Sequence, residues 1–187
     1  MEKPSSYCEY VKTLPDDNIH RVYHDTQYGF KIDSDNELFG RLILEINQAG
    51  LSWTTILNKQ DNFRTAFSNF DIKKIADYDK PDISRLLANS GIVRNKLKIN
   101  SVIFNARKIV ELQKEYGSFK SWLKIKNDSN LNLTNWVALF KENFKFTGNE
   151  ITKEFLTSTG YIKGAHIETC PILDKKNLSK WEAFSLV

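Results

Sequence analysis

The chain has 187 residues, of which 41% are apolar and 27% are charged, and its formal net charge is +4. That length fits one domain over residues 1–187, and the composition is that of an ordinary water-soluble protein. No apolar run approaches the roughly 20 residues that span a bilayer, so no membrane partner is expected. No apolar stretch follows the first six residues, so the sequence also argues against a secretory signal and predicts an intracellular, cytoplasmic protein.

Helical periodicity runs through most of the chain and strict alternation is scarce, so the sequence predicts an all-α fold. The first clear helix starts at caps among residues 33–35 and runs to about Ala49, where Gly50 suits its end. Its apolar stripe consists of Leu38, Phe39, Leu42, Ile43, Ile46 and Ala49. Four short helices are predicted after it, with starts marked by Ser52, Asp61, Asp71 and Pro81.

A tight break at residues 89–94 separates two helical patterns, and the second pattern is a long helix over about 95–115. The elements predicted after it are a short helix from Ser118, a polar surface loop over 126–132, helices near 133–141 and 149–159, and a last helical turn with His166 and Cys170. Residues 171–187 form a tail that the sequence does not place.

The positive charge is concentrated in one stretch. Residues 91–126 hold nine basic and two acidic side chains, a net charge of +7, so the rest of the chain carries −3. The basic residues are Arg94, Lys96, Lys98, Arg107, Lys108, Lys114, Lys120, Lys124 and Lys126. Such a stretch is typical of a protein that binds a phosphate backbone. A solvated helix face has the same pattern, and charge alone does not separate the two.

The chain has two cysteines and three histidines. Cys8 and His24 lie near the start, whereas His166 and Cys170 lie near the end with i, i+4 spacing. Two imidazoles and two thiolates make a closed structural zinc site, which would join the two ends of the chain. His20 lies four residues before His24 and could compete with it. On spacing alone, two buried thiols with unrelated histidines are the more common arrangement.

Glu45 falls on the apolar face of the first long helix, because it follows Leu38 and Leu42 at helical spacing. An acid in that position is costly without a partner, and a ligand with amine donors or positive charge would supply one. An internal ion pair, or an acid that reaches water at the helix flank, is the more common arrangement.

Aromatic residues bracket this helix, with Tyr23 before it and Trp53 after it. Both could stack on a flat base, although a place in the core is more frequent for such residues. Gly91 lies in the break before the basic helix. It could present backbone N–H groups and the positive end of a helix to a phosphate, but any helical hairpin offers a similar signal.

Together these residues resemble the 3-methyladenine DNA glycosylase I family, a divergent branch of the helix-hairpin-helix DNA glycosylases. The resemblance extends from Cys8 to about Cys170, and its most specific stretch is Leu44-Glu45-Ile46-Asn47-Gln48-Ala49-Gly50-Leu51-Ser52-Trp53. The other matching stretches are Tyr23-His24-Asp25, Gly91-Ile92-Val93-Arg94-Asn95-Lys96-Leu97-Lys98-Ile99 and Phe144-Lys145-Phe146-Thr147-Gly148.

The resemblance implies one structural zinc ion, Zn²⁺, bound by Cys8, His24, His166 and Cys170, and so it favours His24 over His20. It also implies an enzyme that flips 3-methyladenine out of alkylated double-stranded DNA and hydrolyses its N-glycosidic bond. The expected catalytic residue is Glu45, and the base-binding residues are Glu45, Tyr10, Tyr23 and Trp53. The expected DNA-binding residues are Gly50, Leu51, Gly91, Arg94 and Lys96.

The chemistry agrees with this reading. A purine methylated at N3 carries positive charge and leaves easily, so a carboxylate in a dry pocket favours it over neutral adenine. The break at residues 89–94 holds no lysine that would suggest a Schiff-base lyase step, so the reaction is predicted to be monofunctional. A monomer is expected.

Three features depart from the family pattern. Tyr10 stands where many members have Trp, His20 where a pocket Tyr is common, and Gln27-Tyr28 where Glu-Trp is frequent. These residues belong to the segment that walls the pocket in the family, so they bear on the range of lesions. The alternative function is a non-catalytic relative that binds damaged DNA, and the presence of Glu45 with Trp53 favours the enzyme. The basic stretch disfavours a third reading, a helical protein that binds small molecules.

Overall fold

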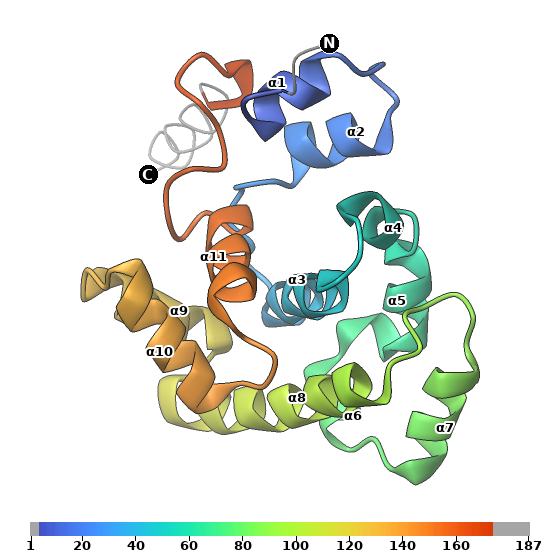
Figure 1. Ribbon diagram of the computed structural model, residues 1–187. Coiled ribbons are helices and arrows are strands. Elements are labelled where there is room, and N and C mark those ends of the chain that lie inside the picture. Colours follow the sequence, from blue (N-terminus) through green and yellow to red (C-terminus); the bar gives the residue numbers. More distant parts are fainter. Residues whose placement is uncertain (1–3, 174–187) are drawn as a thin grey trace, which may run out of the picture. The chain divides into compact units, whose positions relative to one another are not determined.

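The computed structural model describes residues 4–173, and the regular structure in that range is helical throughout (Figure 1). The prediction of an all-α fold is therefore confirmed for these residues. None of the described helices combines the length and the hydropathy needed to cross a membrane. Most of the predicted tail, residues 174–187, lies outside the described residues.

The chain divides into two compact units. We call residues 4–31 and 156–173 the terminal unit, and residues 32–155 the central unit. Helix α11 (Asn149–Ser158) begins in the central unit, and its last residues belong to the terminal unit. The single domain expected from the chain length stays a prediction.

The terminal unit joins the start of the chain to its C-terminal segment. Its first part consists of two short helices, α1 (Tyr7–Lys12) and α2 (Ile19–Thr26). The Gly29 N–H donates to the carbonyl of Ser158 at 2.7 Å, which ties the two parts together. Gly160 has a φ of +72°, and a Cβ there would lie 2.7 Å from the Gly29 carbonyl oxygen, so this close approach requires glycine.

Helix α3 (Asp35–Gln48) is largely buried, since each residue from Leu38 to Asn47 is buried. As predicted, a cap precedes it: the Ser34 hydroxyl accepts from the backbone N–H at position 37. The helix ends at its C-cap, Ala49, and Gly50 follows with a φ of +81°. Between Leu38 and Asn47 the helix has no water-facing side for a polar residue, so an acid in that stretch needs a specific reason.

Helix α3 contacts α4 (Trp53–Leu57), α5 (Gln60–Ala66), the 3-10 helix η1 (Ser68–Phe70), α6 (Ile72–Ala76), α8 (Lys96–Tyr116) and α9 (Phe119–Asp128) (Figure 1). Helix α7 (Lys80–Ala88) contacts α8, and an aromatic ring of α10 (Leu133–Asn143) packs against one of α9. The predicted caps Ser52 and Asp71 are confirmed, and Pro81 lies in the first turn of α7.

Stacked and tilted aromatic rings fill the core near α9 and α10. Ring centroids lie 5.3–6.4 Å apart along the group formed by Phe119, Trp122, Phe140, Phe144 and Phe155. The carboxylate of Asp35, at the start of α3, accepts from the backbone N–H groups of Phe119 and Lys120 at 2.8 and 2.9 Å. The start of α9 is thus fixed to the start of α3.

Two predicted elements were wrong. The surface loop expected from Lys126 begins after Asp128, because the polar residues there continue the solvent face of α9. His166 and Cys170 were expected on a helical turn, but the segment that carries them is not helical: His166 lies in a bend, and a turn closed by the Cys170 N–H and the Ile167 carbonyl follows it. Gly164, with a φ of +117°, precedes this turn and breaks the helical path.

Candidate functional site

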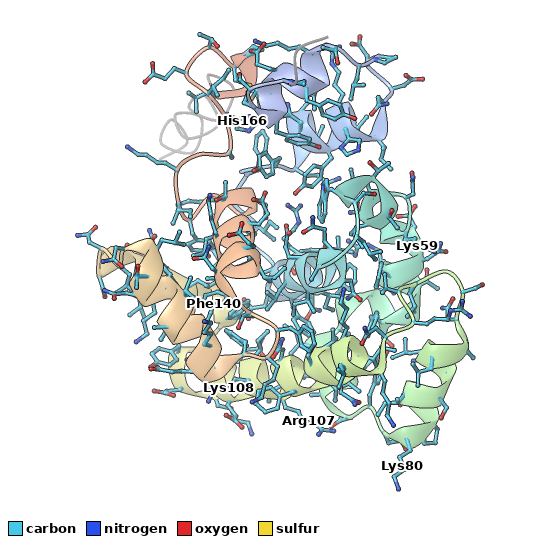
Figure 2. All side chains as sticks on the ribbon, viewed as in Figure 1. Lys59, Lys80, Arg107, Lys108, Phe140 and His166 are labelled. Carbon is cyan, nitrogen blue, oxygen red and sulfur yellow. The ribbon has the colours of Figure 1, made fainter. Side chains whose placement is uncertain are left out.

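Four side chains that can bind a metal converge in the terminal unit. Cys8 comes from α1, His24 from α2, and His166 and Cys170 from the C-terminal turn. Each offers one ligand atom, and the four atoms lie within 4.8 Å of one another. Figure 2 labels His166, which reaches toward the N-terminal helices. The structure brings these four predicted residues together in an arrangement that could hold a metal ion.

The distances within this cluster are short and similar. The His24 Nε2 and His166 Nδ1 atoms lie 3.1 Å apart. The Cys8 Sγ lies 3.3 Å from the first nitrogen and 3.8 Å from the second. The Cys170 Sγ lies 3.8 and 3.5 Å from the same two atoms. Burial, and secondarily the neighbouring Cys170 sulfur, raise the pKa of the Cys8 thiol, so two thiolates in this place need a cation.

Each histidine of the cluster uses its other ring nitrogen on an outward partner. The Nδ1 of His24 lies 2.6 Å from the carboxylate of Asp25. The Nε2 of His166 lies 2.8 Å from the carbonyl oxygen of Tyr28. A ring that donates outward keeps the lone pair of its inward nitrogen free for a ligand bond. This arrangement is the usual support of metal-binding histidines.

His20 lies outside the cluster. Its Nδ1 is 3.0 Å from the hydroxyl of Tyr7, and its ring packs edge-on against Tyr10 at 5.5 Å. Burial lowers the pKa of His20, which favours the neutral ring. The geometry therefore selects His24 rather than His20, as the family pattern implied.

A group of tyrosine rings lies next to His20 in the terminal unit. Tyr7 is central to this group, with ring centroids 6.2 Å from Tyr10, 6.4 Å from Tyr23 and 5.4 Å from Tyr28. Tyr23 is buried, whereas Tyr10 is 36% exposed. Of the two tyrosines predicted to bind a base, Tyr10 therefore has the more accessible ring.

Glu45 and Trp53 belong to the central unit. Glu45 is 1% exposed on α3, which confirms that it lies on the buried face of this helix. Trp53 is half-buried in the first position of α4, where the Ser52 hydroxyl accepts from the backbone N–H of Thr55. Between them, Gly50 and Leu51 form an exposed turn, and the Leu51 side chain is 40% exposed.

The hairpin segment, which we define as residues 89–98, connects α7 to α8. The Gly91 N–H donates to the side-chain oxygen of Asn89 at 2.8 Å, so this N–H is engaged within the protein. The Asn95 side chain caps α8 by accepting from the N–H groups of Leu97 and Lys98 at 3.0 and 3.1 Å. Arg94 and Lys96 are exposed. The charged side chains of this segment are therefore better placed than the Gly91 N–H to meet a ligand.

Part of the basic stretch is engaged within the protein. The Arg107 guanidinium donates to the carbonyls of Ala76 and Tyr78 at 2.7 and 3.3 Å, which fixes α8 to the segment after α6. Lys98 is buried, and burial lowers its pKa. The stretch is therefore not simply a solvated helix face, since part of its charge holds the fold.

The comparison with protein families settles which family this chain represents. Residues 13–136 match the model of the methyladenine glycosylase family. The chain belongs to that family. The predicted family and enzyme class, a DNA glycosylase that hydrolyses N-glycosyl bonds, are confirmed.

Named relatives are similar over nearly their whole length. The chain is 30% identical to DNA-3-methyladenine glycosylase 1 of Escherichia coli over 87% of this chain and 94% of the relative. It is 31% identical to DNA-3-methyladenine glycosylase of Haemophilus influenzae over 82% and 92%. The solved structure of 3-methyladenine DNA glycosylase I from Staphylococcus aureus, which concerns 3-methyladenine recognition, matches with a TM-score of 0.77 at 29% identity, over 84% and 93%.

Sequence reasoning missed several residues that support the site. Asp25 was noted only as part of a motif, although a carboxylate directly after a ligand histidine is a detectable signal. The Tyr28 carbonyl could not be found, because any residue offers a carbonyl. Lys98 was counted as surface charge, and its burial depends on contacts 49 and 51 residues away.

Proposed function

We propose that this protein is a monofunctional glycosylase that flips 3-methyladenine out of alkylated double-stranded DNA and hydrolyses its N-glycosidic bond. The observation that carries the proposal is the carboxyl group of Glu45, which is 1% exposed in the stretch of α3 from Leu38 to Asn47 that is buried throughout. The chain belongs to the methyladenine glycosylase family, and a similar protein of solved structure is described as recognising 3-methyladenine, so a buried carboxylate fits a binding role. It is the electrostatic complement of a cationic base.

Glu45 would act through its charge. A carboxylate inside protein interacts more strongly with a cation than one in water does, because the surrounding dielectric constant is lower. It would therefore bind the methylated, positively charged purine in preference to neutral adenine. The purine is already an activated leaving group, so the protein needs to supply little acid catalysis, and water completes the hydrolysis.

Trp53, Tyr23 and Tyr10 would supply flat surfaces for the flipped base. Stacking on an aromatic ring contributes about 1–3 kcal/mol per base. Tyr10 and His20 replace residues common in the family, so this wall is the place where the lesion range would differ.

DNA would be held by the central unit. We propose that α7, the hairpin segment and α8 act as the helix-hairpin-helix element of the family, with the exposed Arg94 and Lys96 at phosphates. The exposed turn of Gly50 and Leu51 would occupy the gap that the flipped base leaves. The protein would act as a monomer on one lesion at a time.

We propose that the four-residue cluster binds one Zn²⁺ ion. Zn–S bonds of about 2.3 Å and Zn–N bonds of about 2.0 Å in a tetrahedron separate two nitrogens by about 3.3 Å, and a nitrogen from a sulfur by about 3.5 Å. The corresponding distances here are 3.1 Å and 3.3–3.8 Å, which fit that geometry. Four protein ligands leave no open position, so the ion would supply structure rather than catalysis.

The proposal is tested by incubating the purified protein with methylated duplex DNA. We expect free 3-methyladenine in solution and unbroken strands with abasic sites, because no lyase step is proposed. Release of the base with concurrent strand cleavage would contradict the monofunctional mechanism. Tight binding of methylated duplex without any base release would instead identify a non-catalytic damage-binding protein.

A further inference from the structure

Two lysines connect the end of α3 to the hairpin segment, and both lie in the central unit. The Lys98 ammonium donates to the carbonyls of Asn47 and Ala49 at 2.9 and 2.6 Å. In the opposite direction, the Lys59 ammonium donates to the carbonyls of Ser90 and Gly91 at 3.1 and 3.2 Å. Residues 47–59 and the hairpin segment thus each give one ammonium group to the backbone of the other.

Lys98 is in an unusual place for a lysine. It is 6% exposed, and it lies in the first turn of α8, where the helix dipole disfavours positive charge. Burial itself also disfavours the charged form, and accordingly it lowers the pKa of Lys98. Burying an apolar side chain here would avoid this desolvation cost, so the ammonium is expected to be retained for the acceptors that it bonds.

The end of α3 is where the Lys98 ammonium is useful. Helix α3 has no basic residue in its own last turn. Carbonyl groups at a helix C-terminus lack partners within the helix, and a cation there satisfies them and complements the dipole. Lys98 supplies this charge from α8. It therefore fixes the backbone from which the exposed Gly50–Leu51 turn departs.

Lys59 completes the connection from the other side. It is half-buried between α4 and α5, at the N-cap of α5, where no side chain caps the helix. Figure 2 labels it next to the loop that joins α7 to α8. Gly91 also packs closely on α5, because a Cβ on it would lie 3.1 Å from the side-chain Cγ of Asn62.

We propose that Lys98 and Lys59 are positioning residues that form a clamp, which holds the hairpin segment and the Gly50–Leu51 turn in one fixed register. This inference rests on the proposed function. With the clamp in place, the side that grips phosphate and the side that enters the base stack cannot shift independently. When the hairpin segment binds phosphates, the Gly50–Leu51 turn is then already in position at the base stack and needs no further movement.

The clamp predicts that its loss lowers the rate of excision from duplex DNA and leaves the affinity for the free base unchanged. Free 3-methyladenine needs only the pocket residues, so its affinity does not depend on the register of the hairpin. Excision from duplex DNA needs both sides at once. Misplacing a reacting group by about 1 Å can lower a rate by about 100-fold, so even a small slip at the clamp is measurable.

The test compares three variants of the full-length protein: Lys98→Met, Lys59→Met and, as a control, Lys141→Met. Lys141 is exposed in the last turn of α10, outside the basic stretch and the hairpin segment. For each we would measure single-turnover release of 3-methyladenine from methylated duplex and the affinity for the free base. Lys98→Met should release base about tenfold to 100-fold more slowly, with free-base affinity within about twofold of wild type.

Lys59→Met should show the same split with a smaller loss, and Lys141→Met should match wild type. In the double variant the losses should be less than multiplicative, because both lysines hold the same joint. If Lys98→Met does not fold, Lys59→Met decides, since its side chain is only half-buried.

Wild-type release rates in both clamp variants would overturn the clamp, as would equal losses in excision and in free-base affinity. If the wild-type protein releases no base, the proposed function falls first, and the clamp's role falls with it. Activity in the wild type separates these two failures.

Discussion

The two units of the chain differ in the side chains that converge inside them. The terminal unit has helices of six and eight residues in its N-terminal part, and the ligand atoms of Cys8, His24, His166 and Cys170 converge there. The central unit has a helix of 21 residues and encloses fully buried phenylalanine and tryptophan rings. One unit is organised around ligand atoms and the other around apolar surface.

This difference predicts which kind of change should destabilise each unit. A small segment buries too little apolar area for independent stability, and ligand bonds to a metal can supply the rest. The larger unit gains its stability by removing aromatic and aliphatic side chains from water. Metal removal and core truncation should therefore act on different parts of the same chain.

The largest expected effect is that of removing the metal. Protein purified without chelators should contain about one equivalent of zinc, and Cys170→Ser should lose it and unfold the terminal unit. Structural zinc contributes roughly 10–16 kcal/mol in small zinc-binding peptides, so the loss should exceed that of any core substitution. Elemental analysis and amide hydrogen exchange would measure both changes, and exchange in α8 should stay slow.

His20→Ala is the matched control for the metal site, because His20 lies near the cluster but donates no ligand atom to it. It should retain zinc in full. Less than half an equivalent of zinc in the wild type, or loss of zinc in His20→Ala, would show that the ligand assignment is wrong.

The next effect concerns the aromatic core. Phe140, labelled in Figure 2, is fully buried, and Phe140→Ala should lower the free energy of unfolding by about 3–5 kcal/mol. Ile125→Ala, at a side chain that is 48% exposed, should change it by less than about 1 kcal/mol. Chemical denaturation would measure both values. Zinc loss in Phe140→Ala under native conditions would contradict the claim that core truncation and metal removal act on different units.

The smallest of these effects concerns the surface of the central unit. Neutralising Arg94 and Lys96 together should weaken binding to damaged and undamaged duplex equally, because phosphate contacts carry no sequence information. The slope of log affinity against log salt should fall by about 1 for each lost contact. Titrations at several salt concentrations would measure it. A changed lesion preference at unchanged overall affinity would show that these residues read the base instead.

Local signals predicted much of the fold. The caps Ser34, Ser52 and Asp71 act within one helical turn, and so they could be read from neighbouring residues. The segment that holds His166 and Cys170 was predicted to be helical and is not. Their i, i+4 spacing fits a helix, but a non-helical segment can also bring two such side chains to one cluster.

The residues of the candidate site also differ in whether the sequence could predict them. Spacing alone could not choose between His20 and His24, and only the family pattern favoured the residue that the cluster contains. The burial of Glu45 followed from helical periodicity, because its face was apolar on both sides in sequence. The burial of Lys98 did not, because its partners are carbonyl groups, which every residue has.

The central claim is that the charge of Glu45 recognises a cationic base, and Glu45→Gln tests it most directly. This substitution keeps the shape of the side chain and removes its charge. Melting temperature, zinc content and single-turnover release of 3-methyladenine from methylated duplex would be measured on the same preparation. We expect an unchanged melting temperature and zinc content with base release reduced about tenfold to 100-fold, as for a lost charged hydrogen bond of about 1.5–3 kcal/mol. A lowered melting temperature with base release at the wild-type rate would contradict the account, because it would assign Glu45 to the fold alone.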